Sequence, residues 1–381
     1  MNNTQVGGGV RSTLLIEALS KLGHVDVVSF VKEPLESSIP NCDVIFSGGT
    51  PKGVSTLNNR IIHFLKITFT PWSFKGYFSI NKEQENIISH YYNANNYDFV
   101  VCHFIWEAIP CGLMRYADRL IIDVDDNFIS ATKRDSANAI SSPFSPFFTR
   151  IKMRMLRRMQ NHFLKRVKLS FYSNENDPPH KKSVFLHNVP LLTYPCLDIT
   201  ESTPMRILFV GNIDFFPNKE GLVHFVEYIY PIIKQRIPTV ELNIVGMCKD
   251  QETKSKLSAI SGVNVLGFVD FLREEYQNCR AVIVPLYHGS GTSIKFIEGI
   301  MMNRPVVSTQ IGARGFNNFF HANQHYCLAN SDQEFANHAV NLLSDLDNSV
   351  LMAKMAYEIG KTHFSKQSFY DVVTKSIETI S

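Results

Sequence analysis

The residues best suited to chemistry stand close together in the second half of the chain, just after a short apolar run. Gly289 and Gly291 follow this run. They precede a stretch of helical periodicity that contains Lys295 and Glu298. Glycines let a backbone approach a ligand closely, and the free N–H groups of a helix start attract an anion. A lysine in a first helical turn opposes the helix dipole, so a bound phosphate explains Lys295 better than helix stability does. Glu298 would lie on the same helix face, where its carboxylate could accept the hydroxyls of a ribose.

A less specific interpretation also fits this segment. Its glycines could serve only a tight strand-to-helix turn, with Lys295 and Glu298 as a solvated ion pair. The strand, turn and helix succeed one another as in phosphate-binding motifs, however, and another apolar run follows at Asn303–Thr309. These features favour a site for a nucleotide diphosphate.

In the first half of the chain, an apolar run ends in acidic residues. Asp125 and Asp126 would lie at the carboxyl end of a buried strand, where a carboxylate could orient or partly deprotonate a hydroxyl. Asp126 could equally cap a following helix, and a metal held by these two residues with Asp123 is a weaker alternative. His103 ends another apolar run and is a further candidate, although a histidine satisfied within the core is the more common case.

A run of three glycines, Gly7-Gly8-Gly9, stands before the amphipathic stretch Arg11–Leu22. Gly8 and Gly9 could form a functional loop, or they could belong to a flexible terminus. So short a motif leaves both interpretations open.

The elements that must position these residues follow from the hydrophobic pattern. Short apolar runs rich in β-branched residues alternate with longer amphipathic stretches, which predicts parallel sheets covered by helices, and hence doubly wound α/β domains. The expected strands are His24–Phe30, Asp43–Phe46, Phe99–Phe104, Leu120–Val124, Leu169–Tyr172, Val184–Leu186, Arg206–Val210, Val240–Val245, Val263–Leu266, Ala281–Pro285, Pro305–Ser308 and Tyr326–Leu328. The clearest expected helices are Val10–Leu22, Gly221–Arg236, Ile294–Met302 and Gln333–Leu346.

Two domains are expected in a chain of 381 residues. The proline-containing segment Val189–Pro204 is the best linker, so we predict one domain over 1–195 and a second from 196. Two Rossmann-like domains facing one another would bring the carboxyl ends of both sheets to a shared cleft, where ligands bind.

The composition excludes several classes of protein. With 44% apolar and 19% charged residues the chain is not disordered, and no run approaches the ~18 apolar residues of a membrane span. The first residues lack the pattern of a signal peptide. The seven cysteines are scattered without a C-x-x-C pair, so neither a disulfide framework nor a zinc site is indicated. We therefore expect a cytoplasmic protein.

Charge is unevenly distributed between the two halves. Residues 1–195 carry 22 basic and 16 acidic side chains, 22 − 16 = +6, and the rest of the chain carries 16 − 19 = −3. Eight of the basic residues lie in Thr149–Lys168, beside an apolar stripe. Such a helix could lie on the inner face of an anionic membrane, although an ordinary packed helix with a solvated basic face is the simpler interpretation. The small net charge and the lack of a recognition motif argue against nucleic-acid binding.

The segment Gly289–Gly315, G-S-G-T-S-I-K-F-I-E-G-I-M-M-N-R-P-V-V-S-T-Q-I-G-A-R-G, resembles the donor site of retaining GT-B glycosyltransferases of family 4 (group 1). Ile207–Pro217 is similar to the first strand and turn of that family's donor domain, and Gly267–Asp270 to its loop beside the nucleobase. The resemblance is dense over 205–316 and weaker before it. It implies a GT-B fold, a donor domain over 196–362, a last helix, 363–381, that packs back on the first domain, and no metal or other cofactor.

The resemblance also implies roles for individual residues. Lys295 would hold the diphosphate and stabilise the leaving group, Glu298 would hold the ribose, and Asp125 would stand where the family often has a histidine near the acceptor. Gly8, Gly9 and His103 would lie on the acceptor side. The implied donor-binding residues are Gly211, Asn212, Val269, Gly289, Ser290, Gly291, Thr292, Ser293, Ile294, Lys295 and Glu298.

The chain departs from the family pattern at three positions. Ser290 replaces the first of the family's paired glutamates, which removes covalent catalysis by a carboxylate there. Asn212 replaces a frequent arginine, and Asn218, followed by Lys219, replaces a frequent lysine. The charge of a diphosphate would then fall mainly to Lys295 and the helix start, with Arg314 as a further candidate.

We therefore predict an enzyme that transfers a hexose from a nucleotide diphosphate sugar, with retention, to a glycan or lipid-linked glycan. Surface polysaccharide or lipopolysaccharide biosynthesis is the expected setting, with Asp125, Asp126 and Lys295 as the catalytic residues. A non-catalytic nucleotide-sugar-binding subunit of a polysaccharide assembly complex is the alternative that Ser290 would support, and a sugar-nucleotide epimerase of the same architecture is a third.

Overall fold

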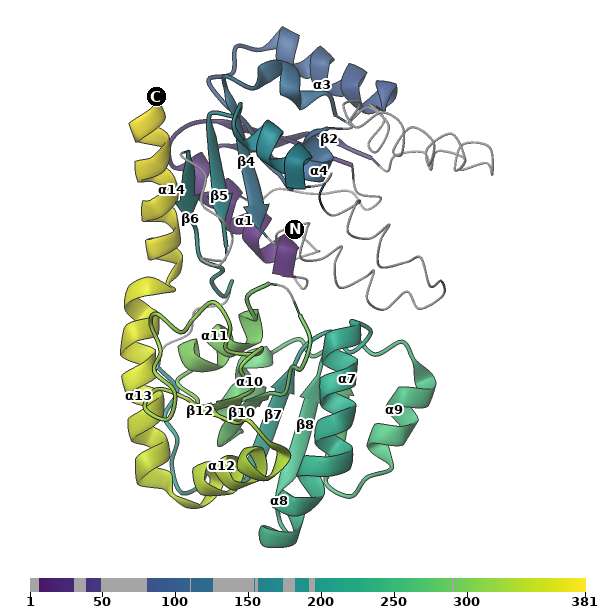
Figure 1. Ribbon diagram of the computed structural model, residues 1–381, viewed down its shortest axis with the longest axis vertical. Helices are drawn as coiled ribbons and strands as arrows, with labels where there is room; N and C mark the ends of the chain where they lie inside the picture. Colours follow the sequence, from purple (N-terminus) through teal and green to yellow (C-terminus); the bar gives the residue numbers. More distant parts are fainter. Residues whose placement is uncertain are drawn as a thin grey trace. The chain divides into compact units, whose positions relative to one another are not determined.

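The computed structural model describes residues 7–30, 39–48, 81–109, 111–125, 154, 157–173, 182–191, 196–289 and 291–381. The chain divides into two compact units (Figure 1). The first unit comprises Met1–His187 with Tyr370–Ser381, and the second comprises Asn188–Phe369. The division therefore falls before the proline-containing segment, and the end of the chain belongs with its beginning.

The second unit contains, within its described residues, a six-stranded parallel sheet in the order β12-β11-β10-β7-β8-β9. The strands follow the predicted apolar runs to within two residues. They are β7 (Arg206–Val210), β8 (Glu241–Val245), β9 (Val263–Gly267), β10 (Ala281–Val284), β11 (Val306–Ser308) and β12 (Cys327–Leu328). The β10 residues are all buried, as expected of a central strand covered on both faces.

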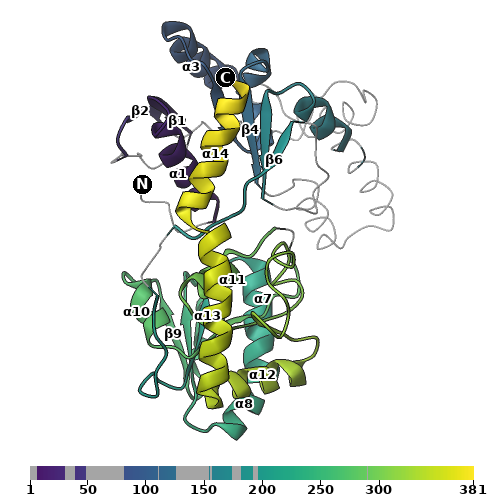
Figure 2. The same ribbon diagram turned by 90° about the vertical axis from the view of Figure 1, so that its left-hand side faces the viewer.

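Helices cover both faces of this sheet. They are α7 (Phe216–His224), α8 (Tyr230–Arg236), α9 (Gln251–Ser258), α10 (Leu272–Gln277), α11 (Ile294–Met301), α12 (Asp332–Ser344) and α13 (Leu346–His363). On one face α12 packs against α8, with Phe335 edge-on to Phe225 in a large apolar core. In a separate aromatic cluster Phe296 of α11 stacks on Phe316, and α11 packs against α13 (Figure 2).

One turn of π-helix, Phe225–Ile229, joins α7 to α8, where the sequence predicts one uninterrupted helix. Pro231, in the first turn of α8, has no N–H to donate, and its ring would collide with the carbonyl four residues earlier. The wider π turn relieves this conflict without ending the helix.

The first unit is built on a parallel sheet in the order β3-β4-β5-β6, with β1 and β2 forming a separate parallel pair within the described residues. The strands are β1 (Val25–Ser29), β2 (Cys42–Ser47), β3 (Val100–His103), β4 (Leu120–Asp125), β5 (Leu169–Tyr172) and β6 (Ser183–Phe185). The helices are α1 (Gly7–Ser20), α3 (Lys82–Ala94), the single turn α4 (Ile105–Ala108) and α14 (Lys366–Ile380), besides a 3-10 turn at Leu113–Tyr116.

The helix α14 lies beside α1 (Figure 2), and side chains connect the two helices. The Tyr370 hydroxyl donates to a Glu17 oxygen, and the Lys21 ammonium lies 3.6 Å from the centre of the Tyr370 ring. A cation over an aromatic face adds to the stability of such a contact. Glu17 and Tyr370 are 353 positions apart in the chain, so this packing closes the first unit around both of its segments.

The glycine run near the start of the chain corrects one expectation. Gly7-Gly8-Gly9 forms the first turn of α1 and is not a loop that precedes the helix. The Thr13 hydroxyl donates to the Gly9 carbonyl at 2.9 Å, and Arg11 is anchored in the unit's core. The tertiary contacts of Arg11 outweigh the poor helix propensity of glycine.

Two other sequence features lie wholly or largely outside the described residues. The basic segment Thr149–Lys168 is described only at 154 and from 157, where Met159, Phe163 and Leu164 are buried. The other is Asp126. Among the described helices, none is both long enough and apolar enough to cross a bilayer.

Candidate functional site

The strand order of the second unit locates the candidate donor site. Counted outward from β7, the order runs through β8 and β9 on one side and through β10, β11 and β12 on the other. The chain therefore changes direction between β7 and β10, and ligands of doubly wound sheets bind beyond the carboxyl ends of the strands at such a point. Gly211 and Asn212 directly follow β7, and the glycine-rich turn follows β10.

Lys295 lies in the first turn of α11 and reaches back to the turn after β7. Its ammonium donates to Asn218 Oδ1 at 2.8 Å, and Asn218 Nδ2 donates to the Asn212 carbonyl at 2.8 Å. A Cβ atom at Gly211 would come within 3.1 Å of Lys295 Cε, so the lysine passes directly over that glycine. Burial lowers the pKa of Lys295 to about 8, although Glu298 opposes the shift. Within the part of the chain that the structure describes, the charge of Glu298 therefore does not fully offset the burial of this cation.

Glu298 is one helical turn further on and is held by a buried tyrosine. The Tyr276 hydroxyl donates to Glu298 Oε2 at 2.9 Å, and the tyrosine is fully buried. Burial raises the pKa of Glu298, while the hydrogen bond from Tyr276 and the charge of Lys295 pull it down. Tyr276 therefore fixes the carboxylate through one oxygen.

The glycine-rich turn is held from behind by Arg314. Its guanidinium donates to the carbonyls of Gly289 and Gly291, at 2.9 Å each, so the arginine supports the turn through its backbone. Thr292 accepts a hydrogen bond of 3.0 Å from the Asn188 amide. Ser290, between the two glycines, is outside the described residues.

The start of α11 has no side-chain cap. Ser293 occupies the N-cap position but makes no capping hydrogen bond, and its hydroxyl is buried without a partner in the part of the chain that the structure describes. Ile294 begins the helix. The first N–H groups of a helix are unsatisfied unless they are capped, and together with the helix dipole they form an anion site. Lys295 adds a formal positive charge at the same place.

Lys219 and Val269, which were also named from the sequence, do not lie at the turn before α11. The Lys219 ammonium pairs with Asp250 at 2.5 Å, so its charge is already compensated. Val269 lies half-buried in the loop after β9, which is separated from β7 by β8. That spacing of two strands is about 10 Å, the distance over which a nucleotide could reach from its phosphates to its base.

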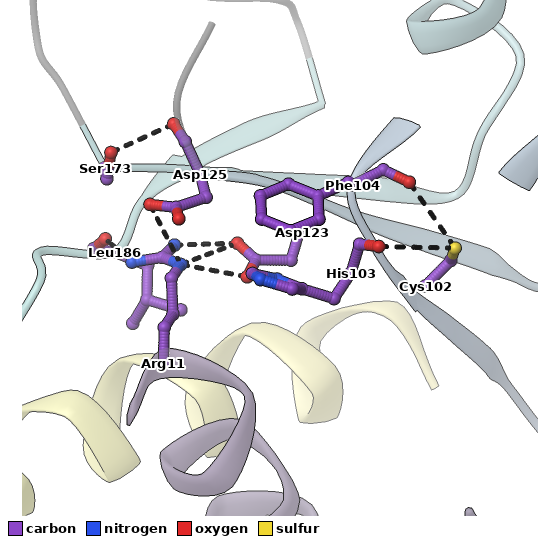
Figure 3. A network of polar contacts seen from close by, with 8 residues as sticks. All are labelled: Arg11, Cys102, His103, Phe104, Asp123, Asp125, Ser173 and Leu186. Carbon is purple, nitrogen blue, oxygen red and sulfur yellow. Dashed lines mark hydrogen bonds and ion pairs between the residues drawn. The ribbon is translucent and has the colours of Figure 1, made fainter. Parts of the chain in front are cut away.

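The candidate site of the first unit is a buried polar network at the carboxyl ends of β3 and β4 (Figure 3). Arg11 Nε donates to Asp123 Oδ1 and Oδ2 at 3.0 and 2.9 Å, Nη2 donates to Oδ1 at 2.7 Å, and Nη1 donates to the Leu186 carbonyl at 2.7 Å. His103 Nδ1 lies 2.8 Å from Asp123 Oδ2. Arg11 and His103 together lower the pKa of Asp123 to about 2 against the effect of its burial.

Asp125 lies at the edge of this network. Its carboxylate is 3.8 Å from Arg11 Nε, its backbone has a φ of 48°, and the Ser173 hydroxyl donates to its carbonyl at 2.9 Å. A left-handed conformation is uncommon for residues other than glycine, although aspartate adopts it more readily than most, and such positions are frequent at functional sites. The residue is only 8% exposed, so any ligand that it contacts must enter the sheet edge itself.

Among the described residues, Asp123 and Asp125 do not form a metal site. Asp123 already accepts three hydrogen bonds from Arg11 and lies against His103, which leaves its oxygens little capacity for a cation. Elsewhere in the described residues, His24 Nε2 lies 3.2 Å from both Asp26 and Asp43, at an exposed position on β1 and β2. The expectation that no metal is needed stays a prediction.

The structure thus brings together Gly211, Asn212, Lys295, Glu298 and the turn that leads into α11. In the first unit it joins His103 to Asp123 and brings Asp125 beside them. Sequence reasoning did not assign roles to Arg11 and Tyr276, because neither stands in a motif, and it treated Asn218 only as a departure from a pattern.

Comparison with known proteins bears on the family and the fold. Residues 204–345 match the family model of group 1 glycosyl transferases. A Klebsiella pneumoniae protein described as an uncharacterized 44.6 kDa protein in the cps region is 21% identical over 97% of this chain and 95% of its own length.

Solved structures share the fold over nearly the whole chain. Sucrose-phosphate synthase from Thermosynechococcus elongatus has a TM-score of 0.69 at 14% identity, over 98% of this chain and 93% of its own. Anabaena HepE in complex with UDP and glucose has 0.66 at 12% identity, over 100% and 97%. WaaG, a glycosyltransferase involved in lipopolysaccharide biosynthesis, has 0.62 at 14% identity, over 98% and 95%.

These similarities identify the class of protein. The chain has the GT-B fold, with two Rossmann-like bodies built on parallel sheets. It carries a group 1 glycosyltransferase domain over residues 204–345, and it is a transferase enzyme.

Proposed function

We propose that the protein transfers a hexose from a nucleotide diphosphate sugar to a glycan or lipid-linked glycan, with retention at the anomeric carbon, as members of glycosyltransferase family 4 do. The observation that carries the proposal is Lys295. It is a half-buried cation at an uncapped helix start, at the point of the sheet where ligands bind, and among the described residues the nearby Glu298 offsets its burial only in part. A diphosphate would supply the missing negative charge.

The same geometry suggests how each part of a nucleotide would be held. The diphosphate would accept hydrogen bonds from the first amides of α11 and from Lys295, while Asn218 keeps the ammonium aimed at the turn after β7. Glu298 would accept ribose hydroxyls through Oε1, since Tyr276 occupies Oε2. The base would reach toward Val269, and Gly289 and Thr292 would contact the phosphates and the sugar.

Transfer would then proceed by attack of an acceptor hydroxyl on the face from which the diphosphate leaves. The bond from the anomeric carbon to the phosphate oxygen breaks, the bond to the acceptor oxygen forms, and the acceptor proton passes to the departing phosphate. Lys295 and the helix amides would stabilise the growing negative charge, which is usually the largest contribution to catalysis. Asp125 and Asp126 would orient the acceptor, and no metal ion takes part in this scheme.

The names of the relatives support the choice of donor and setting. HepE was solved with UDP and glucose, WaaG is involved in lipopolysaccharide biosynthesis, and the Klebsiella relative comes from a cps region. We accordingly propose a UDP-sugar as donor and a surface polysaccharide or lipopolysaccharide as product. A cytoplasmic site of action, with contact between Thr149–Lys168 and the inner face of the membrane, completes the proposal.

The proposal is tested by ligand binding. A thermal-shift screen of UDP-, GDP- and dTDP-sugars identifies the donor, because a ligand that binds only the folded state raises the unfolding temperature. Calorimetry with that nucleotide then compares Lys295→Met with Lys219→Met, a matched control whose charge is already paired with Asp250. We expect a loss of about 10- to 100-fold in affinity for the first variant, since one charge-assisted hydrogen bond contributes about 1.5–3 kcal/mol. Equal affinities in the two variants would refute the site.

A further inference from the structure

The histidine at the end of β3 presents an unusual arrangement of its two ring nitrogens (Figure 3). Nδ1 of His103 lies 2.8 Å from Asp123 Oδ2. Nε2 is buried, and no group among the described residues forms a hydrogen bond with it. Buried polar atoms nearly always have partners, so an exception in a native structure calls for a ligand or another functional explanation.

The protonation of the ring follows from its partners. Asp123 is ionised, because the charge of Arg11 holds its pKa near 2 against the effect of burial, and an ionised carboxylate can only accept hydrogen bonds. Nδ1 must therefore carry the proton that Asp123 accepts. In the neutral ring this leaves Nε2 with a lone pair, which makes it an acceptor for a ligand hydroxyl.

The surroundings fix the orientation of the imidazole as well as its tautomer. Arg11 donates hydrogen bonds to Asp123 from Nε and Nη2 and to the Leu186 carbonyl from Nη1. These contacts fix the orientation of the Asp123 carboxylate. The Phe104 ring packs on the imidazole with centroids 3.7 Å apart, and the Phe104 amide donates to the Asp123 carbonyl at 2.8 Å. A group held in this way by a second layer of contacts is prepared for binding before the ligand arrives.

The backbone at the same edge is strained. Phe104 and Asp125, which directly follow His103 and Val124, have φ angles of 71° and 48°. Non-glycine residues with positive φ cluster at binding and catalytic sites, where the surrounding structure enforces them. The strain, the unsatisfied nitrogen and the carboxyl end of a parallel sheet therefore coincide at one place.

We propose that His103 Nε2 accepts a hydrogen bond from a sugar hydroxyl, and that Asp123 and Arg11 are positioning residues that hold the imidazole in the required tautomer and orientation. The identity of the ligand as a sugar rests on the proposed function. The contacts among Arg11, Asp123 and His103 lie entirely within the first unit and do not depend on the proposed function. The hydroxyl could belong to the hexose of the donor or to the acceptor, and the experiment separates these two sources.

The direct test is nuclear magnetic resonance of the ¹⁵N-histidine-labelled full chain, with His103 assigned by comparison with His103→Gln. In the free protein we expect Nδ1 to be protonated and Nε2 to be unprotonated, and Asp123→Asn to reverse or mix the tautomers. The probes are UDP, UDP-glucose and methyl glucoside. A shift of Nε2 with UDP-glucose but not with UDP indicates a donor hydroxyl, and a shift with UDP and methyl glucoside together indicates an acceptor hydroxyl.

Two results would overturn the inference. One is an Nε2-protonated ring in the free protein, and the other is an Nε2 signal that no sugar probe moves. Calorimetry of UDP on the same sample separates the two proposals. If UDP binds but no sugar shifts the Nε2 signal, the proposed role of His103 is wrong, whereas the proposed donor site is still supported.

Kinetics provide the second measurement. We expect His103→Ala to lower the rate of UDP-glucose turnover by about 10²-fold with UDP affinity unchanged, as the loss of an orienting contact does. His103→Gln, which keeps a polar group near the position of Nε2, should recover part of the rate. His90→Ala, on the exposed side of α3, serves as the matched control and should behave as the unaltered protein does. Equal rates in His103→Ala and His90→Ala would contradict the proposal.

Discussion

The two units each place a cationic side chain near the carboxyl edge of a parallel sheet, but they treat its charge in opposite ways. Arg11 is almost fully buried and is matched by Asp123, whose pKa it helps to hold near 2. Among the described residues, Lys295 donates a hydrogen bond to the neutral Asn218, and burial lowers its pKa to about 8 although Glu298 opposes the shift. A compensated cation stabilises a structure, whereas an incompletely compensated one is available to an anionic ligand. The comparison therefore separates a positioning network from a binding site.

The largest expected effect follows from breaking the compensated pair. Arg11→Met leaves Asp123 buried without its counter-charge, which destabilises a protein by about 3–5 kcal/mol. Urea denaturation should show this loss in the unfolding of the first unit. The double variant Arg11→Met with Asp123→Leu should recover most of it, because apolar residues of similar volume can replace a buried ion pair. A stable single variant would mean that Arg11 is not needed to balance Asp123.

The next effect comes from giving Lys295 a second neighbouring carboxylate besides Glu298. Asn218→Asp would place a carboxylate 2.8 Å from the ammonium in the position of the present amide oxygen. The added negative charge should raise the pKa of Lys295 and weaken UDP binding by about tenfold or more, through repulsion of the diphosphate. Calorimetry measures this loss, and Asn218→Ser, which adds no charge, should retain more of the affinity. Unchanged UDP binding in Asn218→Asp would place the phosphates elsewhere.

The pH dependence of UDP binding tests the protonation of Lys295 directly. Its folded-state pKa of about 8 lies below the ordinary value of 10.5, and a bound diphosphate requires the protonated form. Affinity should therefore fall about tenfold per pH unit above pH 8. For the free protein the sign is opposite, because the unfolded chain binds more protons than the folded one between pH 8 and 10.5, so this group adds stability as pH rises.

Lys295→Arg provides the matched control for this profile. Arginine stays protonated throughout the range, so the variant should bind UDP with little change between pH 8 and 10. Isothermal titration calorimetry measures the UDP affinity of both proteins across that range. If the affinity falls equally in both, the titration of a group other than Lys295 causes the fall.

The smallest expected effect concerns the carboxylate beside the lysine. Tyr276→Phe removes the 2.9 Å hydrogen bond that fixes Glu298 and leaves the packing nearly intact. One such bond contributes about 0.5–1.5 kcal/mol, so the preference for UDP over 2′-deoxy-UDP should change several-fold. Glu298→Ala should remove that preference altogether. If both variants discriminate as the unaltered protein does, Glu298 does not bind the ribose.

Much of the fold could be predicted from the sequence. Each predicted strand is present with ends that differ by two residues at most, because a strand buried on both faces must be a continuous apolar run. The α/β class and the transferase assignment are confirmed. The glycine run was the main error in local structure, since the packing of α1 and not its propensity decides its conformation.

The candidate site was less accessible to such reasoning. Lys295 and Glu298 stand in one motif after one strand, so their spacing alone brought them together. The partners Asn218 and Tyr276 come from α7 and α10, and no pattern in the sequence links them to α11. The assignment of Lys295 and Glu298 as donor-site residues, like that of Asp125 as a catalytic group, stays a prediction.

The sequence by itself determined the order of strands and helices, the class of the fold and the motif that suits a phosphate, because these depend on local periodicity and on neighbouring residues. Only the tertiary structure decided which charges are compensated. Arg11 and Asp123 are 112 positions apart, and Lys295 and Asn218 are 77 apart, so the balance of each charge appears only when the sheets bring distant segments together. The protonation of a buried group depends on that balance, and the chemistry of both edges depends on the protonation.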